Sequence, residues 1–257
     1  MIDNQIISKI QTSFSKLEFN EEEHLYNVEN KPFTSVSKKI DTFVKKEDFD
    51  IIAYNIAKKI SITRGRENEV MEIKADILAE WKETNDEAKD RGHRVHLFGE
   101  KYVFDRTVSP TIIEDEKGNR KSCPQEQAIV KFWNEVPSHI IPACIELRMY
   151  HPSLAFAGTS DILLFDTKSK TFIIADYKTN KDLFKNHQEK KLLAPFDNLL
   201  DNPYNKYQIQ LSFYQILFEQ TGYKVSSRKI IWLLKTGEYV MYEADDLTSQ
   251  ILKIQFN

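Results

Sequence analysis

Two aspartates lie on consecutive segments whose composition predicts the strands of a β-hairpin. Aliphatic and aromatic residues flank the polar run 166–170, which is typical of a turn. A fold-back centred between positions 168 and 169 pairs Phe165 with Phe172. The same register pairs Asp161 with Asp176, and cross-strand partners have Cβ atoms about 5 Å apart. The sequence therefore predicts two neighbouring carboxylates on one hairpin.

Two carboxylates at this separation repel each other unless a cation lies between them, and hard divalent cations prefer such oxygen ligands. Strand alternation also places Lys178 on the same face as Asp176. A cation held by acids can activate water, while an ammonium group beside it orients the water or stabilises the transition state. This combination predicts hydrolysis of phosphodiester bonds. The alternative is a surface hairpin whose charged side chains form solvated ion pairs.

The triplet acid-x-lysine is common by itself. It recurs at 72–74, 80–82, 87–89, 115–117 and 189–191. Asp176 differs from the acids of those triplets because it follows the apolar run 172–175 and has a partner aspartate on the preceding predicted strand. This context favours the hairpin as the site of chemistry.

Both helices and strands are predicted among the segments that must position these residues. Helical spacing of apolar residues predicts helices at about 49–61, from about 67 through 89 into 91–104, around Ile129, and at 205–222. Strands are predicted at 24–33, with a turn and with Ser35 capping a following helix, and at 141–150, 158–165, 171–178 and 229–244. This order predicts an α/β fold with a central mixed β-sheet flanked by helices. We expect a helical N-terminal portion, residues 1–90, packed on a core formed by residues 91–257.

Composition and charge limit the class of protein. With 41% hydrophobic and 29% charged residues and only 7 Gly, the chain is typical of an ordered globular protein. A net charge of -3 excludes binding to nucleic acid through overall positive charge, so any such contact must be local. No segment is long and apolar enough for a membrane span, which predicts a cytoplasmic protein without a membrane partner. Cys123 and Cys144 are too few for a four-thiolate iron–sulfur cluster.

Four short motifs follow one another along the chain. They are Gly92-x-x-x-His96, Gly158-Thr159-Ser160-Asp161, Asp176-Tyr177-Lys178 and Gln210-x-x-x-Tyr214. In this order they resemble the motifs of the PD-(D/E)XK nuclease superfamily, in particular its RecB-like and lambda-exonuclease-like branch. The wider layout is similar to that of phage-encoded members. The resemblance implies a restriction-endonuclease-like core.

The resemblance also implies roles for the residues of the hairpin. Asp161 and Asp176 would bind a Mg²⁺ or Mn²⁺ ion, with the backbone carbonyl of Tyr177 as a further ligand. Lys178 would be the catalytic lysine. No iron–sulfur cluster is expected, although some relatives carry one.

His96 would complete the metal shell from its helix. Taken alone, it would more simply be a surface or core histidine. However, Gly92 lies one helical turn earlier on the same face, where the lack of a side chain would let the helix approach the sheet. Position and neighbours therefore favour a metal ligand.

Other polar residues are candidates around this centre. Gln210 and Tyr214 share a helix face, and the resemblance implies that they position the nucleic-acid strand or a catalytic group. The alternative for them is a polar pair on a helix with its own apolar stripe. Glu146, on the strand before the Gly158 motif, is a candidate for an acidic contact to the metal or to a residue beside it. Lys181 and Lys185 are candidates for contacts to the DNA backbone, or else simply solvated.

We therefore predict a divalent-metal-dependent DNA nuclease, most simply an exonuclease that acts in DNA recombination, repair or replication. Its partners would be single- or double-stranded DNA and a recombination or replication protein, in the host cytoplasm if the chain is phage-encoded. The alternatives are a catalytically silent nucleic-acid-binding or protein-interaction module on the same fold, and an endonuclease or ribonuclease with the same site. An intact set of acids and lysine favours the enzyme.

Overall fold

The computed structural model describes residues 2–21, 23, 25–114, 118–186 and 188–254. The chain folds as two compact units: unit 1 comprises Met1–Val44 and Val95–Asn257, and unit 2 comprises Lys45–Arg94. This division differs from the expected boundary near residue 90, because the first 44 residues fold together with the later part of the chain.

Within the described residues, eight strands of unit 1 form one sheet in the order β1-β2-β3-β7-β8-β9-β10, with β6 also paired to β7. The strands are β1 (Leu17–Asn20), β2 (Leu25–Val28), β3 (Lys31–Ser35), β6 (Ile140–His151), β7 (Phe156–Asp166), β8 (Thr171–Lys178), β9 (Val225–Leu233) and β10 (Tyr239–Glu243). The pairs β3–β7 and β8–β9 are parallel and the others are antiparallel, so the predicted mixed sheet is confirmed. A separate hairpin consists of β4 (Ile112–Glu114) and β5 (Arg120–Ser122).

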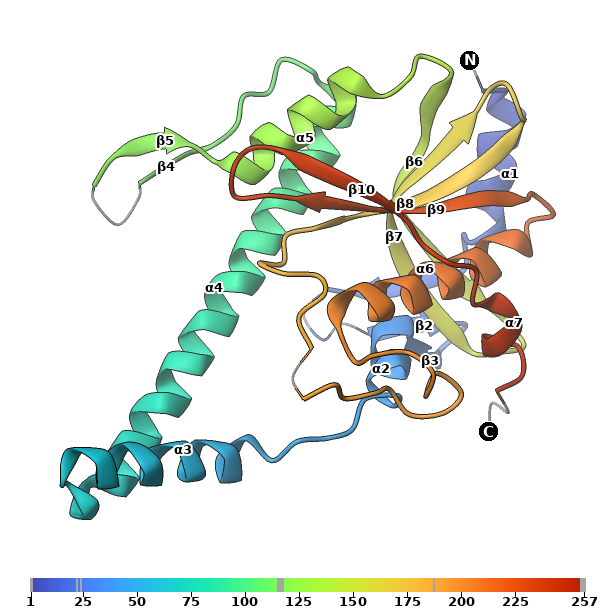
Figure 1. Cartoon of the computed structure of the whole chain (residues 1–257). Helices are drawn as coiled ribbons and strands as arrows, with labels where there is room; N and C mark the ends of the chain where they lie inside the picture. The colour runs from blue at the N-terminus through green and yellow to red at the C-terminus, as the bar shows by residue number, and fades with distance from the viewer. Residues whose placement is uncertain (1, 22, 24, 115–117, 187, 255–257) are drawn as a thin grey trace. The chain divides into compact units, whose positions relative to one another are not determined.

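Alternate side chains of the central strands lie in two hydrophobic clusters, one on each face of the sheet. On β8, Phe172 and Ile174 belong to the first cluster, whereas Ala175 and Tyr177 belong to the second. The first cluster includes side chains of α1 (Asn4–Ser13), α2 (Val36–Asp41), α6 (Pro203–Glu219) and α7 (Thr248–Ile251). The second includes α5 (Pro124–Glu135) and the part of α4 (Val70–Phe104) that starts at Val95. Helices therefore flank the sheet on both faces, as predicted (Figure 1).

The pairing of β7 leaves one stretch of its edge open. Along one edge, β7 pairs with β6 over almost its whole length. Along the other edge, β3 pairs only with Phe156 and Ala157, and β8 pairs only from Ile162 onward. Residues 158–161 lie between these two partners, so the side chains and backbone N–H groups of this motif are left for other contacts.

Local sequence signals set the helix ends near this opening. The Ser35 hydroxyl accepts a hydrogen bond from the Lys38 N–H at 3.2 Å and caps α2, as predicted. The Asn202 side chain caps α6 in the same way, and Pro203 follows at the first helical position, where its missing N–H costs nothing. Asn202 and Pro203 thus fix the start of α6, the helix that carries two of the candidate site residues.

The first 44 residues, which belong to the predicted helical N-terminal portion, contain strands as well as helices. They contain α1 and α2 but also β1, β2 and β3, which extend the central sheet. Only part of this was expected, namely the strand and turn at 24–33. Strands of four or five residues are too short for an alternation of apolar and polar residues to be recognised.

Unit 2 is helical. It contains α3 (Phe49–Arg64), a 3-10 turn η1 (Glu67–Glu69) and the first part of α4. The Asp48 side chain caps α3, and Gly65 ends it at φ 65°, a left-handed conformation that suits glycine. Both long helices were predicted from their periodicity. In the part of the chain that the structure describes, no helix is long and apolar enough to cross a membrane.

Candidate active site

The β7–β8 hairpin has the predicted register, with Phe165 opposite Phe172. At the open end of this hairpin, side-chain carboxylates accept the strand N–H groups. The Asp161 N–H donates to Asp176 Oδ1 at 3.1 Å, and the Tyr177 N–H donates to Asp161 Oδ2 at 2.8 Å. Each carboxylate is thereby fixed in orientation by the backbone beside the other one.

Glu146 approaches Asp161 from the neighbouring strand β6. The residues on both sides of Glu146 pair with the residues that flank Asp161, so the two acids lie opposite each other. Glu146 itself has φ 49°, a left-handed conformation. For a residue other than glycine this conformation costs roughly 1–3 kcal/mol, and such strain is concentrated at functional sites. The backbone is therefore distorted at the position that brings a second carboxylate to Asp161.

His96 reaches the same place from α4. Its Nδ1 lies 3.2 Å from Asp161 Oδ2. The helix comes close because Gly99 has no side chain: a Cβ there would lie 2.7 Å from Cε2 of Tyr177. The expectation that Gly92 provides such a close approach stays a prediction, and within unit 1 Gly99 provides one.

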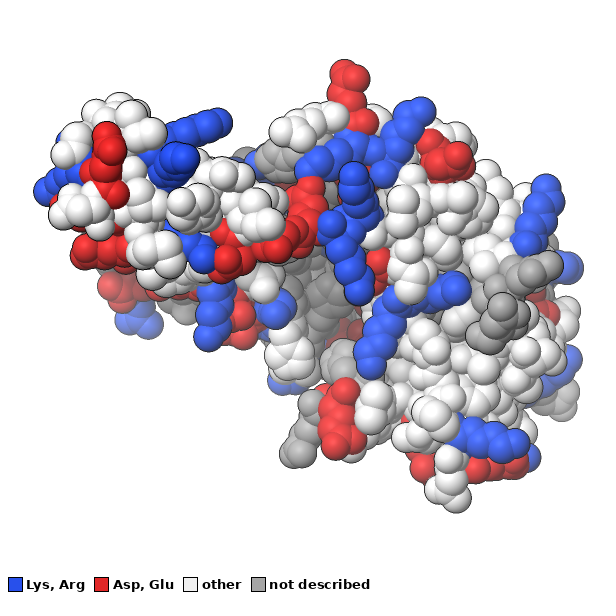
Figure 2. Space-filling view, turned by 90° about the horizontal axis from the view of Figure 1, so that it is seen from below, with Lys and Arg blue, Asp and Glu red and all other residues white. Residues whose placement is uncertain are grey.

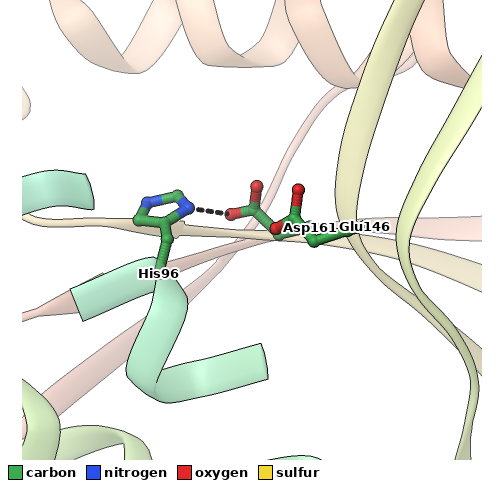
Figure 3. Close-up of side chains that lie close together, drawn as sticks. All are labelled: His96, Glu146 and Asp161. Atoms are coloured by element: carbon green, nitrogen blue, oxygen red, sulfur yellow. Dashed lines mark ion pairs between the residues drawn. The ribbon is translucent and has the colours of Figure 1, made fainter. Parts of the chain in front are cut away.

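His96, Glu146 and Asp161 form a group that can hold a metal ion, which we call the metal group. One donor atom from each lies within 4.8 Å of the others, and each residue is half-buried. Figure 3 shows the imidazole coming from a helix and the two carboxylates from adjacent strands, all pointing toward one another. The predicted ligand set contained Asp176 and the Tyr177 carbonyl. In the described residues, the metal group that the geometry assembles contains Glu146 beside His96 and Asp161, while Asp176 and the Tyr177 carbonyl as ligands stay a prediction.

Asp176 instead belongs to a second set of side chains, the lysine group. Lys178 Nζ donates to Asp176 Oδ2 and to Gln210 Oε1, both at 3.1 Å. Gln210 Nε2 in turn donates to the Tyr214 hydroxyl at 2.9 Å. The ammonium group also lies 4.4 Å from the centre of the Tyr207 ring, a cation–π contact that sequence reasoning missed. Lys178, Gln210 and Tyr214 are thus brought together as expected.

The position of Tyr214 explains why residue 158, at the start of the Gly158 motif, is a glycine. A Cβ at Gly158 would lie 2.7 Å from Cε1 of the Tyr214 ring and 3.2 Å from Cγ2 of Val36. Tyr214 is buried, with 4% of its surface exposed, so its ring has little room to move. The absence of a side chain on β7 therefore lets α6 bring its tyrosine against the open stretch of the strand.

The positive charge available to the acids is smaller than their negative charge. Burial and the Asp161 carboxylate raise the pKa of Glu146 to about 8. Burial alone would raise the pKa of Asp161, but His96 and Lys178 lower it below its ordinary value. Burial and Asp161 also raise the pKa of Asp176, although Lys178 opposes that shift. Three carboxyl groups thus share two basic side chains, and the pKa values of Glu146 and Asp176 are raised.

These acids raise the pKa values of both basic side chains, Lys178 and His96. Burial alone would lower the pKa of Lys178, but Asp176 and Asp161 raise it above its ordinary value. Burial would likewise lower the pKa of His96, and Asp161 raises it. A divalent cation in the metal group would replace the imidazolium proton and offset the repulsion between Glu146 and Asp161. The donor set, one imidazole and two carboxylates, fits Mg²⁺ or Mn²⁺.

Tyr177 has its ring on the opposite face of the sheet from Lys178. Its hydroxyl accepts a hydrogen bond from Trp133 Nε1 at 2.7 Å and is buried in the second hydrophobic cluster. Burial raises the pKa of Tyr177 far above its ordinary value, so the ring serves packing. Its backbone N–H orients Asp161, which is a contribution that the sequence pattern did not indicate.

Lys181 and Lys185, the predicted DNA contacts, are both exposed. They lie on the connection between β8 and α6, which has no helix among its described residues. Acidic and basic side chains are interspersed over the face seen in Figure 2. Such a distribution agrees with the expectation that any contact with nucleic acid is local.

Comparison with models of protein families finds no match for this sequence, and comparison with curated proteins finds none either. The function is therefore argued from the site.

Proposed function

We propose that this chain is a divalent-metal-dependent DNA nuclease that hydrolyses phosphodiester bonds, most simply as an exonuclease in DNA recombination, repair or replication. We assign it to the RecB-like and lambda-exonuclease-like branch of the PD-(D/E)XK superfamily, with a restriction-endonuclease-like core. The four motifs support this assignment. Their residues lie on α4, on the β7–β8 hairpin and on α6, in the order expected along the chain.

One observation carries the proposal. The metal group and the lysine group meet at the β7–β8 hairpin, where the Asp161 N–H donates a hydrogen bond to Asp176 Oδ1. The first offers oxygen and nitrogen donors with an excess of negative charge, and the second offers a fixed ammonium group. Phosphodiester hydrolysis needs both, because a nucleophile must be generated and charge that develops on the phosphate must be neutralised.

His96, Glu146 and Asp161 would hold the ion, which supplies Lewis-acid activation of water and of the phosphate when bound. Lys178 is the side chain that can donate to an anionic phosphate oxygen or orient the attacking water. Gln210 holds the lysine by accepting a hydrogen bond from its ammonium group. Burial raises the pKa of Tyr214 well above its ordinary value, so the phenol stays neutral while it accepts from Gln210.

A catalytically silent binding module is the alternative of a different class. It is disfavoured because the buried ammonium and the strained Glu146 are costly to maintain, and neither is needed for packing. An endonuclease or ribonuclease would use the same groups, so these are outcomes of the test below.

The test is cleavage of end-labelled DNA, linear and closed circular, single- and double-stranded, and of matching RNA, with Mg²⁺ or Mn²⁺ and with EDTA. We expect cleavage that needs the metal and is abolished in Asp161→Asn and Lys178→Ala. The matched control is Lys168→Ala, an exposed lysine at the turn of the same hairpin, which should cleave like the parent. The proposal is falsified if Lys178→Ala and Asp161→Asn both cleave as fast as the parent protein. Cleavage of circles would assign an endonuclease instead.

A further inference from the structure

A short turn directly after β8 presents an aromatic ring to solvent. Phe184 is 46% exposed, whereas the preceding residue, Leu183, is fully buried and anchors the turn in the core. The Asp182 side chain accepts hydrogen bonds from the N–H groups of Phe184 at 2.8 Å and of Lys185 at 3.1 Å. This hydrogen-bonded turn fixes the backbone on which the exposed ring is carried.

Other aromatic rings support Phe184 from behind. Its ring centre lies 5.0 Å from that of Tyr204, in a tilted stack, and 5.4 Å from that of Tyr242, edge to face. Tyr204 is tied to the turn, since its N–H donates to the Leu183 carbonyl at 2.9 Å. Tyr204 and Tyr242 are half-buried and their role is packing, but packing does not account for the exposed side of Phe184. The ring is thus held in place with part of its surface free.

This turn is connected to the lysine group through Asn180. The Asn180 side chain accepts from the Tyr207 hydroxyl at 2.6 Å, and its carbonyl accepts from Trp232 Nε1 at 2.7 Å. Tyr207 lies against the Lys178 ammonium. Phe184 lies six positions after Lys178, so their Cα atoms are at most about 20 Å apart. A few nucleotides of one DNA strand span that distance.

The charged side chains of the turn also suit contact with a DNA strand. Lys181 and Lys185 are both exposed and lie on either side of Phe184 in the sequence. The carboxylate of Asp182 is engaged by backbone N–H groups of the turn, which reduces its repulsion of an approaching phosphate. An aromatic face combined with ammonium groups is the arrangement by which proteins bind single strands, where the base stacks and the phosphates contact lysines. In a duplex the bases are already stacked on each other.

We propose that Phe184, with Lys181 and Lys185, binds an unpaired nucleotide of the DNA strand that enters the active site. The inference rests on the proposed function and names its substrate class: DNA with a single-stranded segment next to the scissile phosphate. The base stacks on Phe184 while the strand continues toward Lys178.

Binding can be measured without cleavage, by fluorescence anisotropy of a labelled oligothymidylate and of a blunt duplex, with EDTA present. Stacking on an aromatic ring contributes about 1–3 kcal/mol per base, so Phe184→Ala should weaken binding of the single strand roughly 5- to 100-fold. Binding of the duplex should not change. The matched control is Phe104→Ala, since Phe104 is 78% exposed and lies in the same unit at the end of α4; it should alter neither.

A second variant reports contact directly. In Phe184→Trp the new indole should keep the affinity and lose fluorescence when oligothymidylate binds. The inference is overturned if Phe184→Ala binds the single strand as tightly as the parent, if both DNA forms weaken equally, or if the indole emission does not respond. Failure of the proposed function has a different signature, which is absence of metal-dependent cleavage by the parent protein.

Discussion

The metal group and the lysine group meet at the β7–β8 hairpin but differ in how their charge is balanced. In the lysine group, the Asp176 carboxylate has the Lys178 ammonium at 3.1 Å, and the ammonium has Gln210 as well. In the metal group, His96 Nδ1 lies 3.2 Å from Asp161 Oδ2, and the pKa of Glu146 rises to about 8 through burial and the neighbouring carboxylate. The lysine group has its cation within the chain, whereas under the proposed function a bound divalent cation would balance the metal group.

The largest expected effect is a fall in the cleavage rate when the lysine group loses its positive charge. Metal affinity should not be lost. Lys178→Met keeps the length of the side chain and removes its charge, so the maximal cleavage rate should fall on the order of 10²–10³-fold, as for loss of one charge-stabilising donor. The Mn²⁺ concentration that gives half the maximal rate should stay the same. Initial rates across a Mn²⁺ titration measure both quantities. A large rise in the required Mn²⁺ would break the distinction between the two groups.

The metal group should respond in the opposite way. His96→Ala removes one donor, so the Mn²⁺ concentration needed for half-maximal cleavage should increase by at least 10- to 100-fold, the range for groups that merely orient a ligand. Excess Mn²⁺ should restore part of the rate. The same titration tests this, with His93→Ala as the control, since His93 is an exposed histidine on the same helix. An unchanged titration for His96→Ala would remove His96 from the metal group.

The close approach of α6 to β7 should lower the stability of a variant that has a side chain at position 158. Gly158→Ala places a Cβ 2.7 Å from the buried Tyr214 ring, so the ring or the helix must shift. We expect the free energy of unfolding to fall by about 1–3 kcal/mol, the usual cost of an overpacked core, and urea denaturation measures it. Affinity for Mn²⁺ should be retained, because Tyr214 belongs to the lysine group. A variant as stable as the parent would contradict this account of the glycine.

The smallest effect concerns the pH dependence of stability without metal. The pKa of Glu146 is raised from its ordinary value of 4.5 to about 8 on folding, so between these values the folded state holds a proton that the unfolded state releases. Stability from this group is therefore lost as the pH rises through this window. Glu146→Gln should remove that contribution, and the melting temperature in EDTA should fall less between pH 5 and pH 8 than for the parent protein. An equal fall of the melting temperature in both proteins would contradict the raised pKa of Glu146.

The sequence predicted the hairpin well because its register depends on local features. The polar turn at 166–170 and the strict alternation of strands fixed the positions of Asp161, Asp176 and Lys178 relative to one another. The helix that carries Gln210 and Tyr214 was predicted for a similar reason, since periodicity over 17 residues is a strong signal.

Glu146 was undervalued because its importance depends on a non-local pairing and a distorted backbone. Nothing in a strand sequence indicates that β6 will pair with β7 so that Glu146 faces Asp161, nor that its φ will be left-handed. The short strand β1 was not predicted for the related reason that it gains its stability from the sheet that it joins. Gly99 was overlooked because the ring that it accommodates, that of Tyr177, is distant in sequence.

The central claim is that His96, Glu146 and Asp161 bind a divalent cation, and isothermal calorimetry with Mn²⁺ tests it most directly. We predict one Mn²⁺ per chain for the parent protein and for Lys178→Met, with similar affinities. For Glu146→Gln we predict binding at least 10-fold weaker, since a charged ligand becomes neutral while its shape is kept. If the parent protein binds no Mn²⁺, or if Glu146→Gln binds it as tightly as the parent does, the metal group does not hold the ion.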